Sequence, residues 1–86
     1  MKSNYKWTKE DKMLVKEFSF KDYLSAMGFA NKVAEVSDKL KHHPNMLIQS
    51  DNKVRIALTT HDVDAVTKMD MEVANLIDHI VEKFYA

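Results

Sequence analysis

The sequence contains no cysteine, and this absence removes several kinds of site at once. Without thiols there is no disulfide framework, no thiolate zinc site and no cysteine nucleophile, so any chemistry must come from histidines, carboxylates and backbone groups. The chain also has one glycine and one proline, which leaves little linker-like sequence. We expect residues 1–86 to form a single domain, because a chain this short cannot divide its core between two.

An excess of charge of one sign is missing, and so is any long apolar run. Thirteen Lys and Arg balance thirteen Asp and Glu, which disfavours nucleic acid or an anionic membrane as a partner. No apolar run approaches the roughly 18 residues of a membrane-spanning helix. Polar sequence follows Met1 without a signal-peptide core. These features predict a cytoplasmic protein.

The first half of the chain has the apolar pattern of two strands and a helix. Residues 13–20 are rich in Val, Leu and Phe and predict a strand, with which a short strand near residues 5–7 could pair. Ser19 is the predicted N-cap of the following helix, with Asp22 three residues on and Phe18 and Tyr23 as a hydrophobic staple. Apolar spacings of three and four then predict a helix over about residues 20–41.

The second half repeats this order. Residues 46–49 and 53–60 predict a hairpin with one solvent-exposed face. Thr67 and Asp70 repeat the capping pattern, and the apolar spacing after them predicts a second long helix. Two amphipathic helices and four half-buried strands predict an α+β fold: a two-layer sandwich of a four-stranded antiparallel sheet with both helices on one face.

Three of the four histidines lie at the ends of predicted elements. His42 and His43 close the first helix, and His61 follows the last strand. Functional groups tend to collect at such ends, and an imidazole pKa of about 6.5 suits acid–base chemistry near neutral pH. An alternative is that His42 and His43 only interact with the negative end of the helix dipole, and that His61 is a hydrogen-bonded loop residue.

A metal site is another hypothesis for the histidines, because imidazole is a common zinc ligand. The pattern argues against it, since adjacent His42 and His43 point in different directions and no helical His pair or Cys completes a ligand shell. His79 lies off the apolar stripe of the second helix and is predicted to be solvated. The role of Trp7, at the sheet edge or in a pocket, stays open.

Five segments of the chain together resemble the pterin-4a-carbinolamine dehydratase family over about residues 13–84. The resemblance depends on their order and spacing: an acid four residues before His-His-Pro, a strand that ends in Thr-Thr-His-Asp, and a Thr-x-x-Asp that opens the last helix. The segments are Phe18-Ser19-Phe20-Lys21-Asp22-Tyr23, Ala34-Glu35, Asp38-Lys39-Leu40-Lys41-His42-His43-Pro44, Val54-Arg55-Ile56-Ala57-Leu58-Thr59-Thr60-His61-Asp62 and Val66-Thr67-Lys68-Met69-Asp70.

This resemblance implies removal of water from a 4a-hydroxytetrahydropterin, in tetrahydrobiopterin recycling, with neither metal nor cofactor. His42 and His61 match the catalytic acid–base histidines of the family. His43, with Pro44, matches the substrate-binding position. Asp38 and Asp70 match acidic positions that could orient the imidazoles, although an exposed helix acid and a helix cap would also explain them.

Three features depart from the family pattern. An aromatic residue usually lies between His-His-Pro and the next strand, where this chain has Asp51. Glycine often precedes the last helix, where Ala65 would be strained if the turn needs a positive φ. The family's N-terminal helix has almost no room before Trp7, so we expect it to be largely missing.

Other partners and functions stay open beside the enzyme. We expect a homodimer or homotetramer, because a small sheet with two free edges invites pairing. An animal member of the family is also a dimerisation partner of a homeodomain transcription factor, so a non-catalytic interaction protein of the same fold is one alternative. A pterin-binding or metal-binding module without turnover is another. The intact His42, His43 and His61 favour the enzyme.

Overall fold

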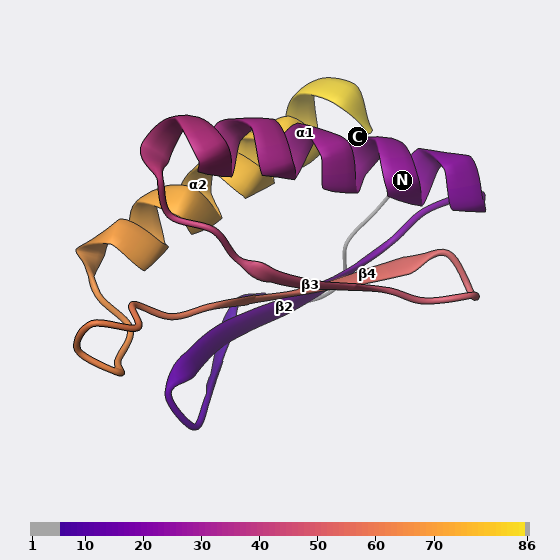
Figure 1. Ribbon diagram of the computed structural model, residues 1–86. Helices are drawn as coiled ribbons and strands as arrows, with labels where there is room; N and C mark the ends of the chain where they lie inside the picture. Colours follow the sequence, from indigo (N-terminus) through magenta and orange to yellow (C-terminus); the bar gives the residue numbers. More distant parts are fainter. Residues whose placement is uncertain (1–5, 86) are drawn as a thin grey trace.

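Strands and helices follow one another in the order β1, β2, α1, β3, β4, α2 in the computed structural model, which describes residues 6–85 (Figure 1). The elements are β1 (Thr8–Glu10), β2 (Met13–Ser19), α1 (Tyr23–Leu40), β3 (Asn45–Ile48), β4 (Lys53–Leu58) and α2 (Lys68–Phe84). Both helices lie on the same face of the sheet (Figure 1). The predicted two-layer α+β sandwich is therefore confirmed.

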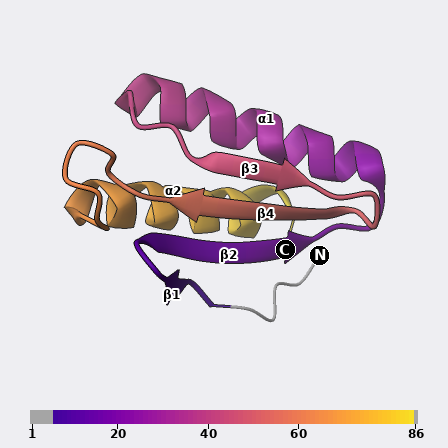
Figure 2. The same ribbon diagram turned by 60° about the horizontal axis from the view of Figure 1, so that its bottom comes forward.

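The sheet is antiparallel throughout, with strand order β1-β2-β4-β3 (Figure 2). In the central pair, Leu14 lies opposite Leu58 and Phe18 opposite Val54. Because side chains alternate between the faces of a strand, this register turns both of these pairs toward the helices.

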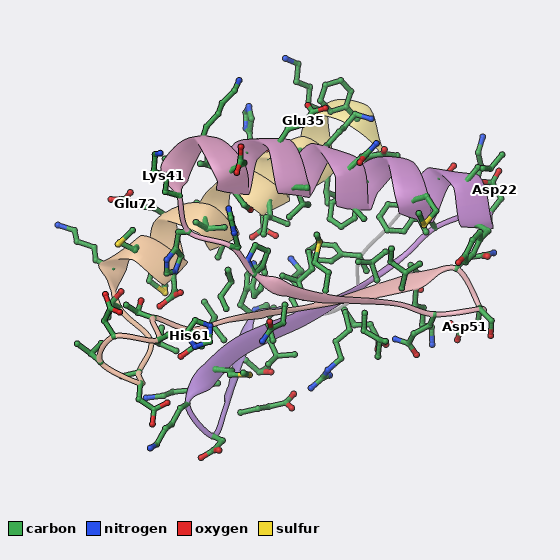
Figure 3. The ribbon with its side chains drawn as sticks, in the orientation of Figure 1. Asp22, Glu35, Lys41, Asp51, His61 and Glu72 are labelled. Atoms are coloured by element: carbon green, nitrogen blue, oxygen red, sulfur yellow. The ribbon has the colours of Figure 1, made fainter. Side chains whose placement is uncertain are left out.

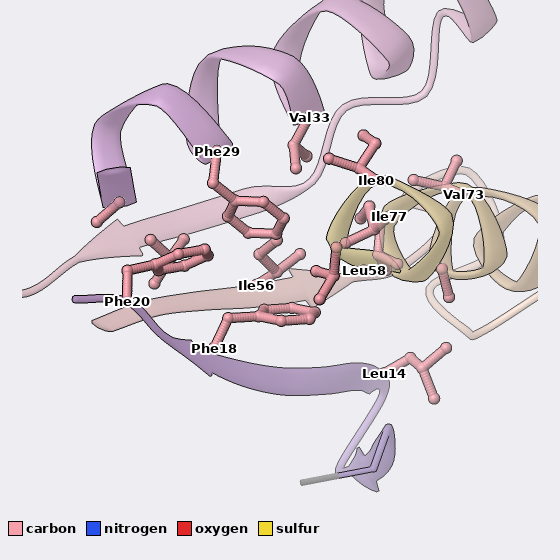
Figure 4. Packing of buried hydrophobic residues seen from close by; sticks show 14 residues of the cluster. Leu14, Phe18, Phe20, Phe29, Val33, Ile56, Leu58, Val73, Ile77 and Ile80 are labelled. Atoms are coloured by element: carbon pink, nitrogen blue, oxygen red, sulfur yellow. The ribbon is translucent and has the colours of Figure 1, made fainter. Parts of the chain in front are cut away.

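The core fills the space between the sheet and the two helices (Figure 4). Phe18 and Phe29 pack with their ring centroids 4.9 Å apart, and Ile77 of α2, in the same cluster, is fully buried. The cluster consists of Leu14, Phe18, Phe20, Ala26, Phe29, Val33, Val54, Ile56, Leu58, Val73, Ala74, Ile77, Ile80 and Val81. Packing around this cluster places the carboxyl-terminal end of α1 and the amino-terminal end of α2 close to one end of the sheet. The candidate site lies at this end.

The start of α1 differs from the prediction. Asp22, and not Ser19, is the N-cap: its side chain accepts a hydrogen bond of 2.7 Å from the backbone N–H of Ser25. Ser19 is still in β2, paired with Lys53, and the N–H of Phe20 bonds to the carbonyl of Asn52. The sheet therefore holds the backbone extended past Ser19, and the helix begins only at the next side chain that can cap it.

The start of α2 agrees with the prediction. Thr67 is the N-cap and forms a capping box with Asp70, whose carboxylate accepts from the backbone N–H of Thr67 at 2.8 Å. His79 is exposed on α2, as expected. Within residues 6–85, no helix combines the length and the apolar character that a membrane span requires.

The first strand begins later than predicted. Within the described residues β1 covers Thr8–Glu10, whereas the expected strand lay near residues 5–7, of which residue 5 falls outside that range. Trp7 lies before β1, stacks edge-on against Phe18 with a centroid distance of 6.0 Å, and donates to Asp78 of α2 at 2.9 Å. It therefore attaches this segment to the core. The prediction of a missing N-terminal helix concerns mainly residues 1–5, which lie outside the described part.

Candidate active site

Three segments that are distant in the sequence meet at one end of the sheet. They are the connection from α1 to β3, the end of β4 with the turn after it, and the first turn of α2; Figure 3 labels Lys41 and His61 at this end. They enclose a cavity of about 490 Å³. Its lining consists of Lys41, His42, His43, Pro44, Asn45, Thr59, Thr60, His61, Asp62 and Met69. The structure thus brings together the three histidines and Pro44 that the sequence singled out.

The end of α1 directs His42 into this region. Lys41 takes a left-handed conformation, with φ of 53°, and its N–H bonds back to the carbonyls of Ser37 and Asp38. The N–H of His42 also bonds to the carbonyl of Ser37, at 3.1 Å. A left-handed residue satisfies the last helical carbonyls and turns the chain away from the helix axis. His42 therefore leaves the helix toward the sheet, with only 11% of its side chain exposed.

His42 is held by a buried carboxylate. Its Nε2 lies 2.5 Å from Oδ1 of Asp70, whose side chain is not exposed at all. The other oxygen of Asp70 accepts from the backbone N–H of Thr67 and from the hydroxyl of Thr60, each at 2.8 Å. Both oxygens of this carboxylate thus have a donor, as a buried charge requires.

These contacts decide the charge of Asp70. Burial raises the pKa of its carboxyl, but the hydrogen bonds from His42, Thr67 and Thr60 outweigh burial and hold the pKa below its usual value. Asp70 is therefore ionised at neutral pH and can only accept hydrogen bonds. Nε2 of His42 must carry the proton of this contact, which leaves Nδ1 as the ring nitrogen that does not bond to Asp70.

His43 has a much weaker partner. Its Nε2 lies 3.3 Å from Oδ1 of Asp38, and the two side chains are 67% and 83% exposed. A pair so open to solvent contributes little to stability and holds neither group in one geometry. Of the two acids expected beside the histidines, Asp70 is fixed against its imidazole and Asp38 makes only a loose surface contact.

His61 lies on the turn that follows β4, and its side chain is exposed. Thr60 and Ala65 close this turn as an isolated bridge, with hydrogen bonds of 3.0 and 3.4 Å between their backbones. The residue with positive φ is Asp64, at 51°, and not Ala65. Aspartate tolerates this conformation, so the strain considered for Ala65 does not arise.

The chain is similar in sequence to proteins of one known family. A sequence profile of the family described as Pterin 4 alpha carbinolamine dehydratase matches residues 1–80. The chain belongs to this family. A relative from Prochlorococcus marinus, provisionally named pterin-4-alpha-carbinolamine dehydratase, is 40% identical over 94% of this chain and 84% of its own length. One of the same name from Sulfurisphaera tokodaii is 39% identical over 87% of this chain and 80% of its own length.

Solved structures share the fold of this pterin dehydratase family member. A transcriptional coactivator/pterin dehydratase from Brucella melitensis aligns with a TM-score of 0.80 and 34% identity, over 86% of this chain and 80% of that one. A pterin dehydratase-like protein identified as a RuBisCO assembly factor in the alpha-carboxysome aligns with a TM-score of 0.72 over 90% of each chain. Its identity is only 22%, so it shows a common fold and nothing about function.

The position that departs from the family pattern in the β3–β4 connection lies far from the cavity. Asp51 is in the turn between these strands, at the opposite end of the sheet from His61 (Figure 3). Its carboxylate is 3.6 Å from Nζ of Lys53. The missing aromatic residue therefore alters a surface turn of this dehydratase family member and not the lining of the site.

The sequence reasoning missed Thr60, which helps to hold the charge of Asp70. A signal for it was present, because Val54, Ile56 and Leu58 point toward the helices and strand alternation places Thr60 on that same side. Thr59 points the other way and donates to the carbonyl of Lys12 at 2.8 Å. In the described part of the chain, no group of three or more His, Asp or Glu side chains is placed to hold a metal ion.

Proposed function

We propose that this protein dehydrates a 4a-hydroxytetrahydropterin to the quinonoid dihydropterin, with His42 and His61 as the acid–base pair and without a metal or cofactor. Membership of the family supports the reaction class. The observation that carries the proposal is the shared cavity, in which His42, fixed through Nε2 by the buried Asp70, lies together with His61.

The reaction needs two proton transfers. The C4a–O bond and the N5–H bond break, a C4a=N5 double bond forms, and one water leaves. A protonated imidazole gives its proton to the departing hydroxyl, and a neutral imidazole accepts the proton from N5. The two imidazoles end with their charges exchanged, and solvent restores them. Each transfer by a positioned group contributes about 10²–10⁴-fold to the rate.

The two histidines suit different halves of this reaction. Asp70 keeps a proton on Nε2 of His42, so a neutral His42 presents Nδ1 as a base for the N5 proton. His61 is exposed and can be protonated again directly from water, which suits the acid that releases the hydroxyl. In this proposal His43 and Pro44 contact the pterin, and Asp38 steadies His43 only loosely.

The product fits a role in tetrahydrobiopterin recycling, because a quinonoid dihydropterin needs only a reductase to return to the tetrahydro form. We expect this activity in the cytoplasm, as the sequence features predict.

The deciding experiment measures the dehydration of freshly generated 4a-hydroxytetrahydropterin by ultraviolet absorbance, against the spontaneous rate. The parent protein should accelerate the reaction, also after exhaustive chelation of metals. His42→Ala and His61→Ala should each lower the rate by about 10²-fold or more, because each removes one proton-transfer group. His79→Ala is the matched control, since His79 is exposed on α2 and does not line the cavity.

Circular dichroism and the thermal midpoint establish that each variant is folded. Rates within about twofold of the parent for both His42→Ala and His61→Ala would remove the mechanism. No acceleration by the parent protein would favour the non-catalytic interaction protein or a pterin-binding module. Loss of turnover on chelation, with recovery on adding zinc, would contradict the metal-free reaction.

A further inference from the structure

A second, smaller cavity adjoins the first and shares His43 and Pro44 with it. Its volume is about 320 Å³, and we call it the side groove. Apart from the shared residues it is lined by Ala34, Ser37 and Asp38 of α1 and by Met46 of β3. The wall is therefore mostly methyl, ring methylene and thioether surface, with few polar groups.

Ser37 is the unusual residue of the side groove. It is only 1% exposed, and its hydroxyl has no hydrogen-bond partner among residues 6–85. The other buried polar side chains of the described residues are satisfied: Thr59 donates to a backbone carbonyl, and both oxygens of Asp70 accept. A buried hydroxyl without a partner is unfavourable, and native proteins seldom keep one unless something else bonds to it.

We propose that the side groove holds the substituent on C6 of the pterin, and that Ser37 forms a hydrogen bond with a hydroxyl group on that substituent. This inference rests on the proposed function. C6 is bonded directly to N5, the atom that loses a proton, so the first atom of the substituent lies two bonds from that nitrogen. In the proposed reaction N5 faces His42, and the next two residues, His43 and Pro44, line both the main cavity and the side groove.

Another cavity, also of about 320 Å³, adjoins the main one through Thr59 and His61. Its remaining lining is Glu10, Asp11, Lys12, Met13 and Asp64, with an exposed ion pair between Lys12 and Asp64. Such a surface suits a charged tail. The side groove instead suits a short neutral hydroxyalkyl group, whose carbons contact Met46 and Pro44 while its hydroxyl reaches Ser37.

The test compares two substrates that differ only at C6: the 4a-hydroxytetrahydropterin with a methyl group and the one with a 1,2-dihydroxypropyl group. Ser37→Ala should lower kcat/KM for the dihydroxypropyl substrate about tenfold, mainly through KM, because one buried hydrogen bond is lost. It should leave the methyl substrate within about twofold of the parent, since that substrate has no hydroxyl to bind.

Ala34→Leu provides a second variant, because Ala34 is an exposed residue of the groove wall and a larger side chain there narrows the groove without disturbing the core. It should reduce turnover of the dihydroxypropyl substrate more than that of the methyl substrate. Asn31→Leu is its control, since it adds the same side chain to an exposed position of α1 outside the groove. This control should leave the ratio of the two kcat/KM values unchanged.

The outcomes distinguish a failure of this inference from a failure of the proposed dehydratase function. If the parent protein turns over neither substrate, the dehydratase proposal fails and this inference fails with it. If the parent turns over both substrates, and Ser37→Ala and Ala34→Leu change both equally or change neither, the side groove does not hold the C6 substituent while the dehydratase proposal stands. Thermal midpoints of all variants show that the comparison is made on folded protein.

Discussion

Asp70 is the residue through which three segments of the site are connected. Its carboxylate accepts from Thr67 at the start of α2, from Thr60 at the end of β4 and from His42 after α1. Because the side chain is wholly buried, none of these bonds competes with water. A change at this one position is therefore expected to alter both the orientation of His42 and the stability of the fold.

Asp70→Asn tests the first of these effects. The amide keeps the volume but removes the charge that fixes the proton on Nε2 of His42, so kcat should fall at least about tenfold with a smaller change in KM. The pH dependence of kcat should also change, which a purely structural role would not produce. Glu72→Gln, an exposed carboxylate on α2, is the control. A kcat within about twofold of the parent would contradict this positioning role.

The contribution of Asp70 to the stability of the fold should depend on pH in the acid range. The fold holds the pKa of Asp70 below its usual value of about 3.9, so its carboxylate stabilises the folded state fully above that pH. This contribution is lost as the pH falls through the lowered folded-state pKa. The difference in free energy of unfolding between the parent and Asp70→Asn should therefore shrink as the pH falls below about 4, measured by urea denaturation. A difference that does not depend on pH would contradict this.

At the scale of secondary-structure elements, the end of α1 sets where His42 leaves the helix. Lys41 has a left-handed backbone that a side chain makes less favourable, whereas glycine adopts it freely. Lys41→Gly should raise the free energy of unfolding by about 0.5–1 kcal/mol in thermal or urea denaturation. Lys39→Gly, within the last turn in helical conformation, should lower it by about 1 kcal/mol. Two changes of the same sign would show that the cap does not control this helix end.

Local sequence patterns predicted the elements well wherever the signal lies within one segment. The capping box of Thr67 and Asp70 and the alternation of Val54, Ile56 and Leu58 depend only on neighbouring residues, and both were predicted. The cap of α1 was placed at Ser19 because the sequence does not show that Ser19 pairs with Lys53 across the sheet. Contacts between distant segments decide such positions, and spacing along the chain does not contain them.

The same limit applies to the site. The order of the elements and the family resemblance pointed to the histidines and to Pro44, and these residues do line one cavity. The contact of Asp70 with His42 joins residues 28 positions apart. The sequence pattern gives Asp70 and Asp38 the same predicted role, whereas only Asp70 holds its histidine closely in the structure. The unpartnered hydroxyl of Ser37 depends on how α1 packs beside β3, which no local spacing reveals.

At the scale of the whole molecule, the sheet formed by residues 6–85 ends in two edge strands, β1 and β3. Large apolar side chains are also exposed in the described residues, among them Leu47 of β3, 56% exposed, and Leu24 of α1, 81% exposed. Exposed edges and apolar surface in a small domain favour self-association. We expect a dimer or tetramer that uses a sheet edge or a helix face.

Light scattering at micromolar concentration measures this directly, because one chain has a mass of 10.0 kDa. Leu47→Lys and Leu24→Lys place a charge on the β3 edge and on the exposed face of α1, respectively. At least one of them should lower the mass of the assembly. A parent protein that is already a monomer at this concentration would contradict the expectation.

Asp70 has two roles, in capping α2 and in orienting His42, and this limits which substitutions the protein can accept during evolution or engineering. Polar groups that serve catalysis commonly lower stability, so replacing them often gives a more stable but inactive protein. Here the same carboxylate caps a helix and orients an imidazole, with every contact satisfied. Selection for stability alone would therefore retain Asp70. We expect Asp70 to be retained also in descendants that have lost catalytic activity.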